Sequence, residues 1–422
     1  MITINADATP LDIAEVVASR FTVDDTRIWS LREVATRYAK IGDTSRGVAV
    51  LAEARTCLDR QNNQQHYLNT LELPSFATDY HALGRSDLAL QVIDASTKIA
   101  GKLRPRFAAS ILAVTAEAAF EIGEEKQCRA LVERVLEYVH GRKRFRFNYH
   151  DRFDQLVPLL LNLGMDEEAV GLAEKMIGPQ RANALAELAK FSRGEVREGY
   201  LQEALRIARE RKSEYCLATI AEVLGSGGEF IRAREIIAEV KQQHVRFEAL
   251  IVMAVQYCEA GRHGEAVAVL EELMTADQTF FYYHQHQLTR LITLLLDGHA
   301  DAVRKLLDRI KLEATKEKKE KDRLLRLTRW ALVAIYSEAE AEGIVDQVLD
   351  ARLEDLNRRE RGWGNNVVQC IMFELLLVIV DHQLRWDEDR RESFRAHLAL
   401  PVRLHMGLEG RARTAKKLMI AS

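Results

Sequence analysis

Apolar and polar positions along this chain repeat with the period of an α-helix, and the helical stretches come in pairs. In Ala254–Leu273, AVQYCEAGRHGEAVAVLEEL, a small residue, a Tyr, a Gly and another small residue follow one another at fixed distances. The stretch Ala35–Ala54, ATRYAKIGDTSRGVAVLAEA, repeats this arrangement more than two hundred residues earlier. Only 6 of 422 residues are Pro, and no long run alternates apolar and polar residues, so the pattern predicts helices.

A glycine marks the break inside each predicted pair. Such a residue commonly ends a helix because it adopts the left-handed conformation without a Cβ clash. Successive marker glycines are 33 to 64 residues apart, and the longest gap hides one further pair that turns near Gly194. Periods of this size are typical of stacked helix hairpins. The markers are Gly42, Gly84, Gly123, Gly164, Gly228, Gly261 and Gly298.

Small and large residues keep constant distances from these glycines, which predicts how the paired helices pack. Small residues are expected where the two helices cross closely, and large apolar residues fill the space beside them. The small residues seven positions before the glycine are Ala35, Ala77, Ala116, Ala221 and Ala254. Those five positions after it are Gly47, Ala89, Cys128, Ala169, Ala233 and Ala266. The large residues are Tyr38, Tyr80 and Tyr257 before it, and Leu51, Ile93, Val132, Ile237, Leu270 and Leu307 after it.

This spacing resembles that of tetratricopeptide (TPR) repeats over roughly residues 25–313. The repeats are degenerate, since many exceed the family's usual length of about 34 residues and lack its closing Pro and its Trp-Leu-Gly opening. A related helical-hairpin family, such as HEAT-like repeats, is the alternative. The resemblance implies an all-α fold, a right-handed superhelical solenoid of about ten antiparallel helix hairpins.

We expect three parts along the chain. Residues 1–24 form an N-terminal capping segment, whose helix begins at Pro10. Residues 25–313 form the TPR-like array, and residues 314–422 add C-terminal hairpins and a cap. In this last part the apolar run 371–380 predicts an inner helix buried nearly all round. The sequence leaves open whether residues 314–422 continue the superhelix or fold back as a dimerisation module.

Charge, cysteine content and apolar runs argue against several classes of protein. The chain has 60 basic and 63 acidic residues, a net charge of −3, which argues against a generic nucleic-acid binder. Five widely spaced cysteines without a CxxC pair predict buried thiols in a reducing compartment. The apolar run 370–380 contains Glu374 and is too short to span a bilayer, and the N-terminus lacks a secretory signal. We therefore expect a cytoplasmic protein without membrane insertion.

No catalytic motif stands out in the sequence. It contains no phosphate-binding loop, HExxH, GxSxG or kinase signature, and GSGGEF at 225–230 predicts a hairpin turn. The aromatic stretch FFYYHQHQ at 280–287 predicts packing against the preceding hairpin, with partner contact as the alternative. A metal site is not expected there, because histidines two apart on a helix point in different directions. We expect no enzymatic activity, no cofactor and no metal site.

One segment, HGRKRFRFNYHDRF at 140–153, interleaves basic and aromatic residues. It has three interpretations. It is an ordinary long connection, or a contact for an acidic protein or peptide, or a nucleic-acid contact that neutralises phosphates and stacks on bases. Its candidate binding residues are Arg142, Arg144, Arg146, Tyr149 and Arg152.

The TPR resemblance also implies a binding groove, because the first helix of each pair lines the concave face in that family. The residues implied to point into it are Arg32, Thr36, Lys40, His81, Glu117, Tyr215, Glu222 and Glu259. Thr36, Thr78 and Glu117 occupy the positions of the Asn that helps some TPR proteins clamp a carboxylate, so that clamp is not predicted. We expect a scaffold or adaptor for a protein or extended peptide, with nucleic-acid binding through 142–153 as the alternative.

Overall fold

A computed structural model describes residues 9–19, 21, 24–62, 71–141, 153, 156–275, 285–316, 373, 376, 377 and 380. The described residues are overwhelmingly α-helical and include no β-strand, as the sequence pattern predicts. The helices are α1 (Pro10–Ser19), α2 (Asp24–Lys40), α3 (Thr44–Asn62), α4 (Ser75–Ala82), α5 (Ser86–Ala100), α6 (Pro105–Glu121), α7 (Glu125–His140), α8 (Leu156–Asn162), α9 (Asp166–Lys175), α10 (Pro179–Phe191), α11 (Gly194–Arg211), α12 (Glu214–Ser226), α13 (Phe230–Glu239), α14 (Gln243–Glu259), α15 (His263–Thr275) and α16 (Gln285–Thr315).

The predicted glycine turns join these helices into hairpins. The marker glycines of α2–α3, α4–α5, α6–α7, α8–α9, α12–α13 and α14–α15 have φ between +69° and +83°, in the left-handed region. At each of these turns the residue after the glycine donates its backbone N–H to a carbonyl five residues back, as Arg262 does to Tyr257 at 2.8 Å. This bond closes the end of the first helix and starts the second without an intervening loop.

The spacing of small and large residues around each glycine is confirmed by the packing. All five alanines seven positions before the glycine are at most 1 % exposed, and so are the described Ala and Cys residues five positions after it. Gly47 shows why such positions are small, because a Cβ there would lie 2.3 Å from a methyl carbon of Leu83. The tyrosines at 38, 80 and 257 are buried beside these crossings and fill the space that the small residues leave.

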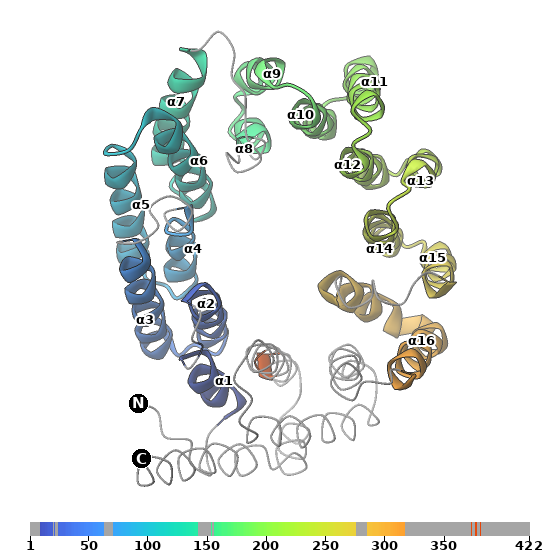
Figure 1. Ribbon diagram of the computed structural model, residues 1–422, viewed down its shortest axis with the longest axis horizontal. Helices are drawn as coiled ribbons and strands as arrows, with labels where there is room; N and C mark the ends of the chain where they lie inside the picture. The colour runs from blue at the N-terminus through green and yellow to red at the C-terminus, as the bar shows by residue number, and fades with distance from the viewer. Residues whose placement is uncertain are drawn as a thin grey trace, which may run out of the picture.

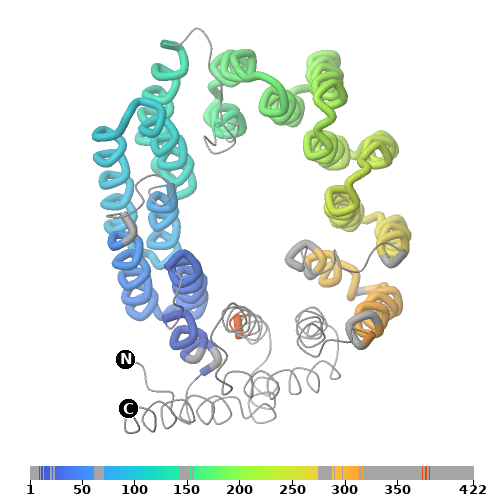
Figure 2. The backbone as a smooth tube through the Cα atoms, viewed as in Figure 1, coloured from blue at the N-terminus to red at the C-terminus, as the bar shows by residue number. Residues whose placement is uncertain are grey.

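The hairpins form two layers that follow an arc (Figure 1). The first helices, α2, α4, α6, α8, α10, α12 and α14, form the inner layer, in which each helix packs on the next. The second helices form the outer layer and are spread further apart, as the backbone trace in Figure 2 shows. Closer packing on one side than on the other bends the array, so the inner helices line its concave side. The structure is therefore a helical repeat architecture.

Ion pairs bridge outer helices that are spread apart. Arg209 of α11 binds Glu239 of α13 with two hydrogen bonds of 2.9 and 2.6 Å. Glu198 of α11 likewise accepts two bonds of 3.0 Å from Arg232 of α13. These pairs are partly exposed, so each adds at most about 1 kcal/mol of stability.

The N-terminal helix α1 begins at Pro10, as predicted, and Thr9 caps it. The Thr9 N–H donates to the Asp12 carboxylate at 2.6 Å, and the Asp12 N–H donates to the Thr9 hydroxyl at 3.2 Å. This reciprocal pair satisfies two helix-end donors. On the same face of α1 as Asp12, Glu15 accepts a hydrogen bond of 2.7 Å from the buried Tyr38 hydroxyl, which fixes α1 on the first hairpin.

Helix α16 differs from the hairpin that the sequence predicts around Gly298. The unit predicted at Gly298 is covered by the single helix α16, in which Gly298 has φ +155°. Figure 1 shows that α16 is bent. The hairpin predicted at Gly343, the segment Lys316–Arg323 beyond its first residue, and the C-terminal tail lie outside the described residues. None of the described helices is long and apolar enough to cross a membrane.

Four residues of the apolar run predicted to be buried are described, and they lie beside the N-terminal helices. Phe373, Leu376, Leu377 and Val380 are helical and at most 5 % exposed. The Phe373 ring packs edge-on against Phe21 and Trp29, with centroids 5.9 and 5.8 Å away. Phe373 therefore brings a distant part of the sequence against the N-terminal helices.

Candidate partner-binding surface

The exposed side chains of the inner helices define the concave face. An inner helix packs on its outer partner and on its two inner neighbours, so the stripe that stays accessible faces the inside of the arc. On α12, for example, Tyr215 and Glu222 are exposed while Cys216, Leu217 and Ile220 are buried. This stripe is the surface that the array offers to a partner.

A cavity of about 350 Å³ opens on the N-terminal part of this face. It lies across α2, α4 and α6, where the inner helices pack side by side. Apolar walls from Trp29, Val114 and Ala118 alternate with charged and hydroxyl groups, a combination found in binding sites. The polar lining residues are Arg32, Glu72, Ser75, Thr78, Glu117 and Glu121.

Arg32 is held in place at this cavity by three contacts. Its Nε donates to the Asp79 carboxylate at 2.5 Å, and a terminal nitrogen donates to the Ser75 carbonyl at 3.3 Å. The guanidinium also lies over the Phe76 ring, 5.3 Å from its centroid. These bonds fix Arg32 to α4 and leave its side chain 23 % exposed at the cavity.

Among the residues that line the cavity, Glu72, Glu117 and Glu121 are acidic and Arg32 is basic. Burial raises the pKa of Asp79, and Arg32 opposes that rise only in part. Partial burial raises the pKa of Glu121 as well, and the nearby Asp79 charge adds to the rise. With Glu117 on the same wall, the cavity has an acidic character with one fixed guanidinium.

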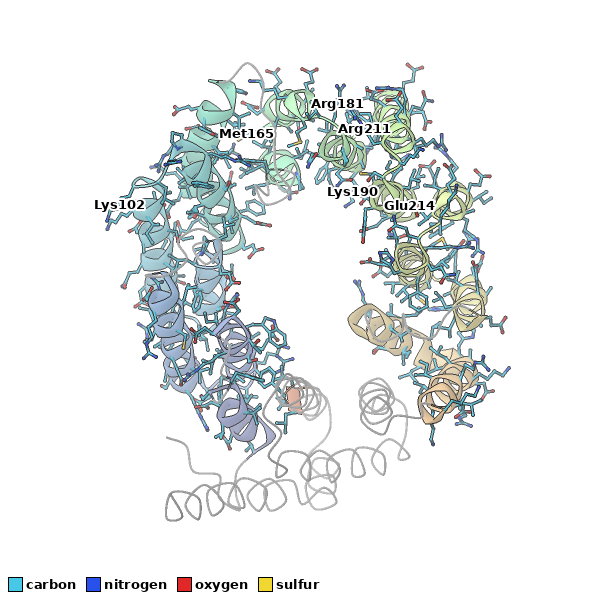
Figure 3. All side chains as sticks on the ribbon, viewed as in Figure 1. Lys102, Met165, Arg181, Lys190, Arg211 and Glu214 are labelled. Atoms are coloured by element: carbon cyan, nitrogen blue, oxygen red, sulfur yellow. The ribbon has the colours of Figure 1, made fainter. Side chains whose placement is uncertain are left out.

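A second polar cluster lies on the concave face of α10, α12 and α14. The Tyr215 hydroxyl and His244 Nε2 are 3.0 Å apart, and their rings meet edge-on across two adjacent inner helices. Lys190 reaches inward from α10 (Figure 3) and pairs with Glu187 at 3.1 Å. The side chain of Glu222 contacts solvent, but the surrounding helices displace part of its water, and this desolvation raises its pKa.

The array carries another predicted groove residue at its far end. Glu259 of α14 forms an ion pair with Arg290 of α16. Both side chains are largely exposed, so this pair adds little stability and leaves both groups accessible.

Apart from Glu259, the predicted groove residues lie at several separate places on the inner helices. Arg32 and Glu117 line the same cavity, and Tyr215 and Glu222 lie together on α12. Lys40 and His81 are exposed at the C-terminal ends of α2 and α4, where the positive charge of Lys40 suits the helix dipole. The Thr36 hydroxyl donates to the Arg32 carbonyl of its own helix at 3.0 Å.

The basic-aromatic residues Arg142, Arg144, Arg146, Tyr149 and Arg152 lie outside the described residues. Phe153, the last residue of that segment, is described and only 1 % exposed, as expected for an aromatic that packs inward. The binding role of the segment stays a prediction.

Several residues of the concave face were not predicted from the sequence. Trp29, 43 % exposed, and His244 are the clearest examples, because both are large polar-tipped rings on exposed stripes of inner helices. A signal existed for each. Trp29 precedes Arg32 by three residues and His244 precedes Glu248 by four, so each shares a helix face with an acid or base.

A further cavity, of about 370 Å³, opens between α9, α10 and α11. Its walls are mostly apolar, from Val170, Leu185, Leu188 and Tyr200, and Arg181 lies on its rim (Figure 3). Arg181 pairs with Glu203 at 3.5 Å across this opening. This cavity forms because α9 and α11 are outer helices and are spread apart from each other.

Comparison with known proteins adds little to this geometry. No protein-family profile matches the sequence, so the TPR resemblance is not confirmed, and no curated protein matches it. Among solved structures, the chain is similar to a "Circular tandem repeat protein with novel repeat topology and enhanced subunit contact surfaces". The identity is 15 %, the match covers 96 % of this chain and 97 % of that one, and the TM-score is 0.28.

Proposed function

We propose that this protein is a non-enzymatic scaffold or adaptor that holds a protein or an extended peptide on its concave face. The proposal includes the finer architecture, a right-handed superhelical array of TPR-like hairpins. The observation that supports it is the cavity on α2, α4 and α6, where an exposed Trp, a fixed Arg and several carboxylates line one opening. Long helical arrays bind through many modest contacts around a few aromatic or Arg anchors.

Each part of the cavity has a binding role in this proposal. Trp29 is the anchor, since its large ring lies half-exposed on a rigid helix and loses little entropy on binding. Arg32 is already oriented by Asp79 and donates to a carbonyl or carboxylate of the partner. Glu117 and Glu121 favour a partner segment that presents a Lys or Arg beside an apolar side chain.

Charge reversal on the cavity tests this function. The tagged protein is used for affinity capture from its own cell extract, with and without nuclease, as wild type and as Glu117→Lys/Glu121→Lys. The matched control is Glu133→Lys/Glu137→Lys, the same charge change at the same spacing on the outer helix α7, where both residues are exposed. We expect the cavity variant to lose a stoichiometric protein partner that the control retains, with helix content unchanged.

Equal capture by both variants would remove the cavity from the site. The nuclease arm tests the alternative function, nucleic-acid binding through residues 142–153. If nuclease releases the captured proteins, and if Arg144→Glu/Arg146→Glu abolishes binding that also falls steeply with salt, the scaffold proposal is replaced by that alternative.

A further inference from the structure

The end hairpin of a helical array has one apolar face without a neighbour, and this face must be covered. In this protein α1 and α2 form that end. Phe21 beside α1 and Ile28 on α2 are only 4 % and 1 % exposed, although no further hairpin precedes them in the described residues. Part of that cover comes from Phe373, which lies far along the chain.

The covering residues form one helical stripe. Phe373, Leu376, Leu377 and Val380 follow one another at intervals of three, one and three, which places all four on one face of a helix. All four are buried, and they belong to the same continuous core as Phe21 and Ile28.

Phe373 makes the contact specific. Its ring meets Phe21 at an interplanar angle of 82° and Trp29 at 70°, both edge-to-face. This geometry places the positive edge of one ring against the negative face of the other, and it is preferred in protein cores. One aromatic side chain therefore contacts both the end of α1 and the concave side of α2.

We propose that the helical residues Phe373, Leu376, Leu377 and Val380 dock on α1 and α2 of the same chain and close the helical array into a ring. The docking surface includes Phe21 and Trp29, and the occupant is the stripe of Phe373, Leu376, Leu377 and Val380. Trp29 belongs both to this seam and to the N-terminal cavity, so closure fixes one wall of that cavity. The proposal does not depend on the identity of any partner.

Photocrosslinking from Phe373 tests the docking in the full-length protein. The side chain is replaced by p-azidophenylalanine, an aromatic of similar shape, and the products are mapped by mass spectrometry after irradiation. We expect capture of peptides containing Phe21 or Trp29. The matched control carries the same probe at Phe247, which is buried in α14, a helix that packs on α12, α13, α15 and α16. The control should capture peptides of those helices and none of α1 or α2.

The same experiment distinguishes closure within one chain from docking between two copies. Unlabelled and ¹⁵N-labelled chains are mixed before irradiation. Products that join only chains of the same isotope support the ring. Mixed-isotope products would show that the end face binds a second copy, and capture that excludes α1 and α2 would show that the seam does not form. Either result overturns the proposal.

A second variant covers the case in which the probe prevents folding. Phe373→Leu keeps the position apolar but removes both aromatic contacts. We expect amide hydrogen exchange in α2 to become roughly tenfold faster, since two edge-to-face pairs that cover this end are lost. Phe247→Leu should leave exchange in α2 at the wild-type rate. Equal exchange in α2 for wild type and Phe373→Leu would contradict closure.

Discussion

Single residues decide where each helix of this protein ends. The marker glycines adopt positive φ because the chain must reverse at once, and at Gly42, Gly84, Gly123, Gly164, Gly228 and Gly261 a Cβ would meet nothing within 4 Å. Glycine is therefore required at these positions for its backbone conformation, because a side chain there would meet no neighbouring atoms. Lys212 is the one described non-glycine residue with positive φ, at +52°, and it ends α11 in the same way.

A pair of glycines in one hairpin separates these two effects. Gly164 has φ +69° at the turn, whereas Gly171 lies inside α9, and both have open space around the Cβ position. We expect Gly164→Ala to destabilise the protein by about 1–2 kcal/mol, because alanine is strained in the left-handed conformation. Gly171→Ala should stabilise it by about 0.5–1 kcal/mol. Chemical denaturation measures the change in the free energy of unfolding for each variant. Equal changes would show that the left-handed conformation at Gly164 does not strain alanine.

Buried thiols make a pH-dependent contribution. Burial raises the pKa of Cys128 and of Cys258 to about 11, from an ordinary value of 9.0. Because the folded-state pKa is the higher one, the unfolded chain loses these protons first as the pH rises. Stability is therefore complete below pH 9 and falls between pH 9 and 11, by about 2 kcal/mol for each thiol.

The measurement is the denaturation midpoint from pH 8 to 11 for wild type and for Cys128→Ala/Cys258→Ala. Lys and Tyr residues titrate in the same range in both proteins, so only the difference between the two profiles is informative. The double variant should lose less stability over this interval. Parallel profiles would mean that these thiols do not contribute.

At the scale of elements, each hairpin is positioned by contacts that come from its neighbours. The N-terminus of α14 shows this clearly. The Glu214 carboxylate, at the start of α12, accepts hydrogen bonds from the backbone N–H groups of Lys241 and Gln242 at 2.7 and 2.5 Å. A side chain of one repeat therefore satisfies the free donors at the start of the next inner helix.

Removing this charge tests the link between the two repeats. We expect Glu214→Gln to destabilise the start of α14 by about 1 kcal/mol, because an amide oxygen is a weaker acceptor and lacks the charge that favours a helix N-terminus. Glu210→Gln is the control, since Glu210 is exposed and pairs with Arg206 of its own helix, α11. Hydrogen exchange of residues 241–246 should accelerate in the first variant and stay unchanged in the second.

The whole molecule behaves as a chain of neighbours, since nearly all contacts connect adjacent hairpins. A local defect should therefore spread no further than the adjoining repeats. We expect Gly164→Ala to accelerate hydrogen exchange in α8, α9 and the helices that pack on them, α6, α7 and α10. Exchange in α14 and α15 should keep the wild-type rate. Uniform acceleration along the whole array would show global cooperativity instead.

The sequence by itself determined the local architecture, because that information is carried by residues close together in the chain. Helical periodicity, the glycine at each turn, and small residues such as Ala35 and Ala89 at the crossings all act within one hairpin. The same spacing placed Arg32, Glu117, Tyr215 and Glu222 on inner helices through the implied repeat register. The left-handed conformation of Lys212 was not predicted, because it arises from the chain reversal between α11 and α12 and no glycine marks the position.

Only the tertiary structure decided which residues from different hairpins meet. The ion pair of Arg32 with Asp79, the contact of Tyr215 with His244 and the packing of Phe373 on Trp29 all join separate repeats. Their distances depend on how steeply the array bends, and each hairpin adds a small rotation that no local pattern specifies. The packing of Phe373 on Trp29 forms only after all these rotations have accumulated.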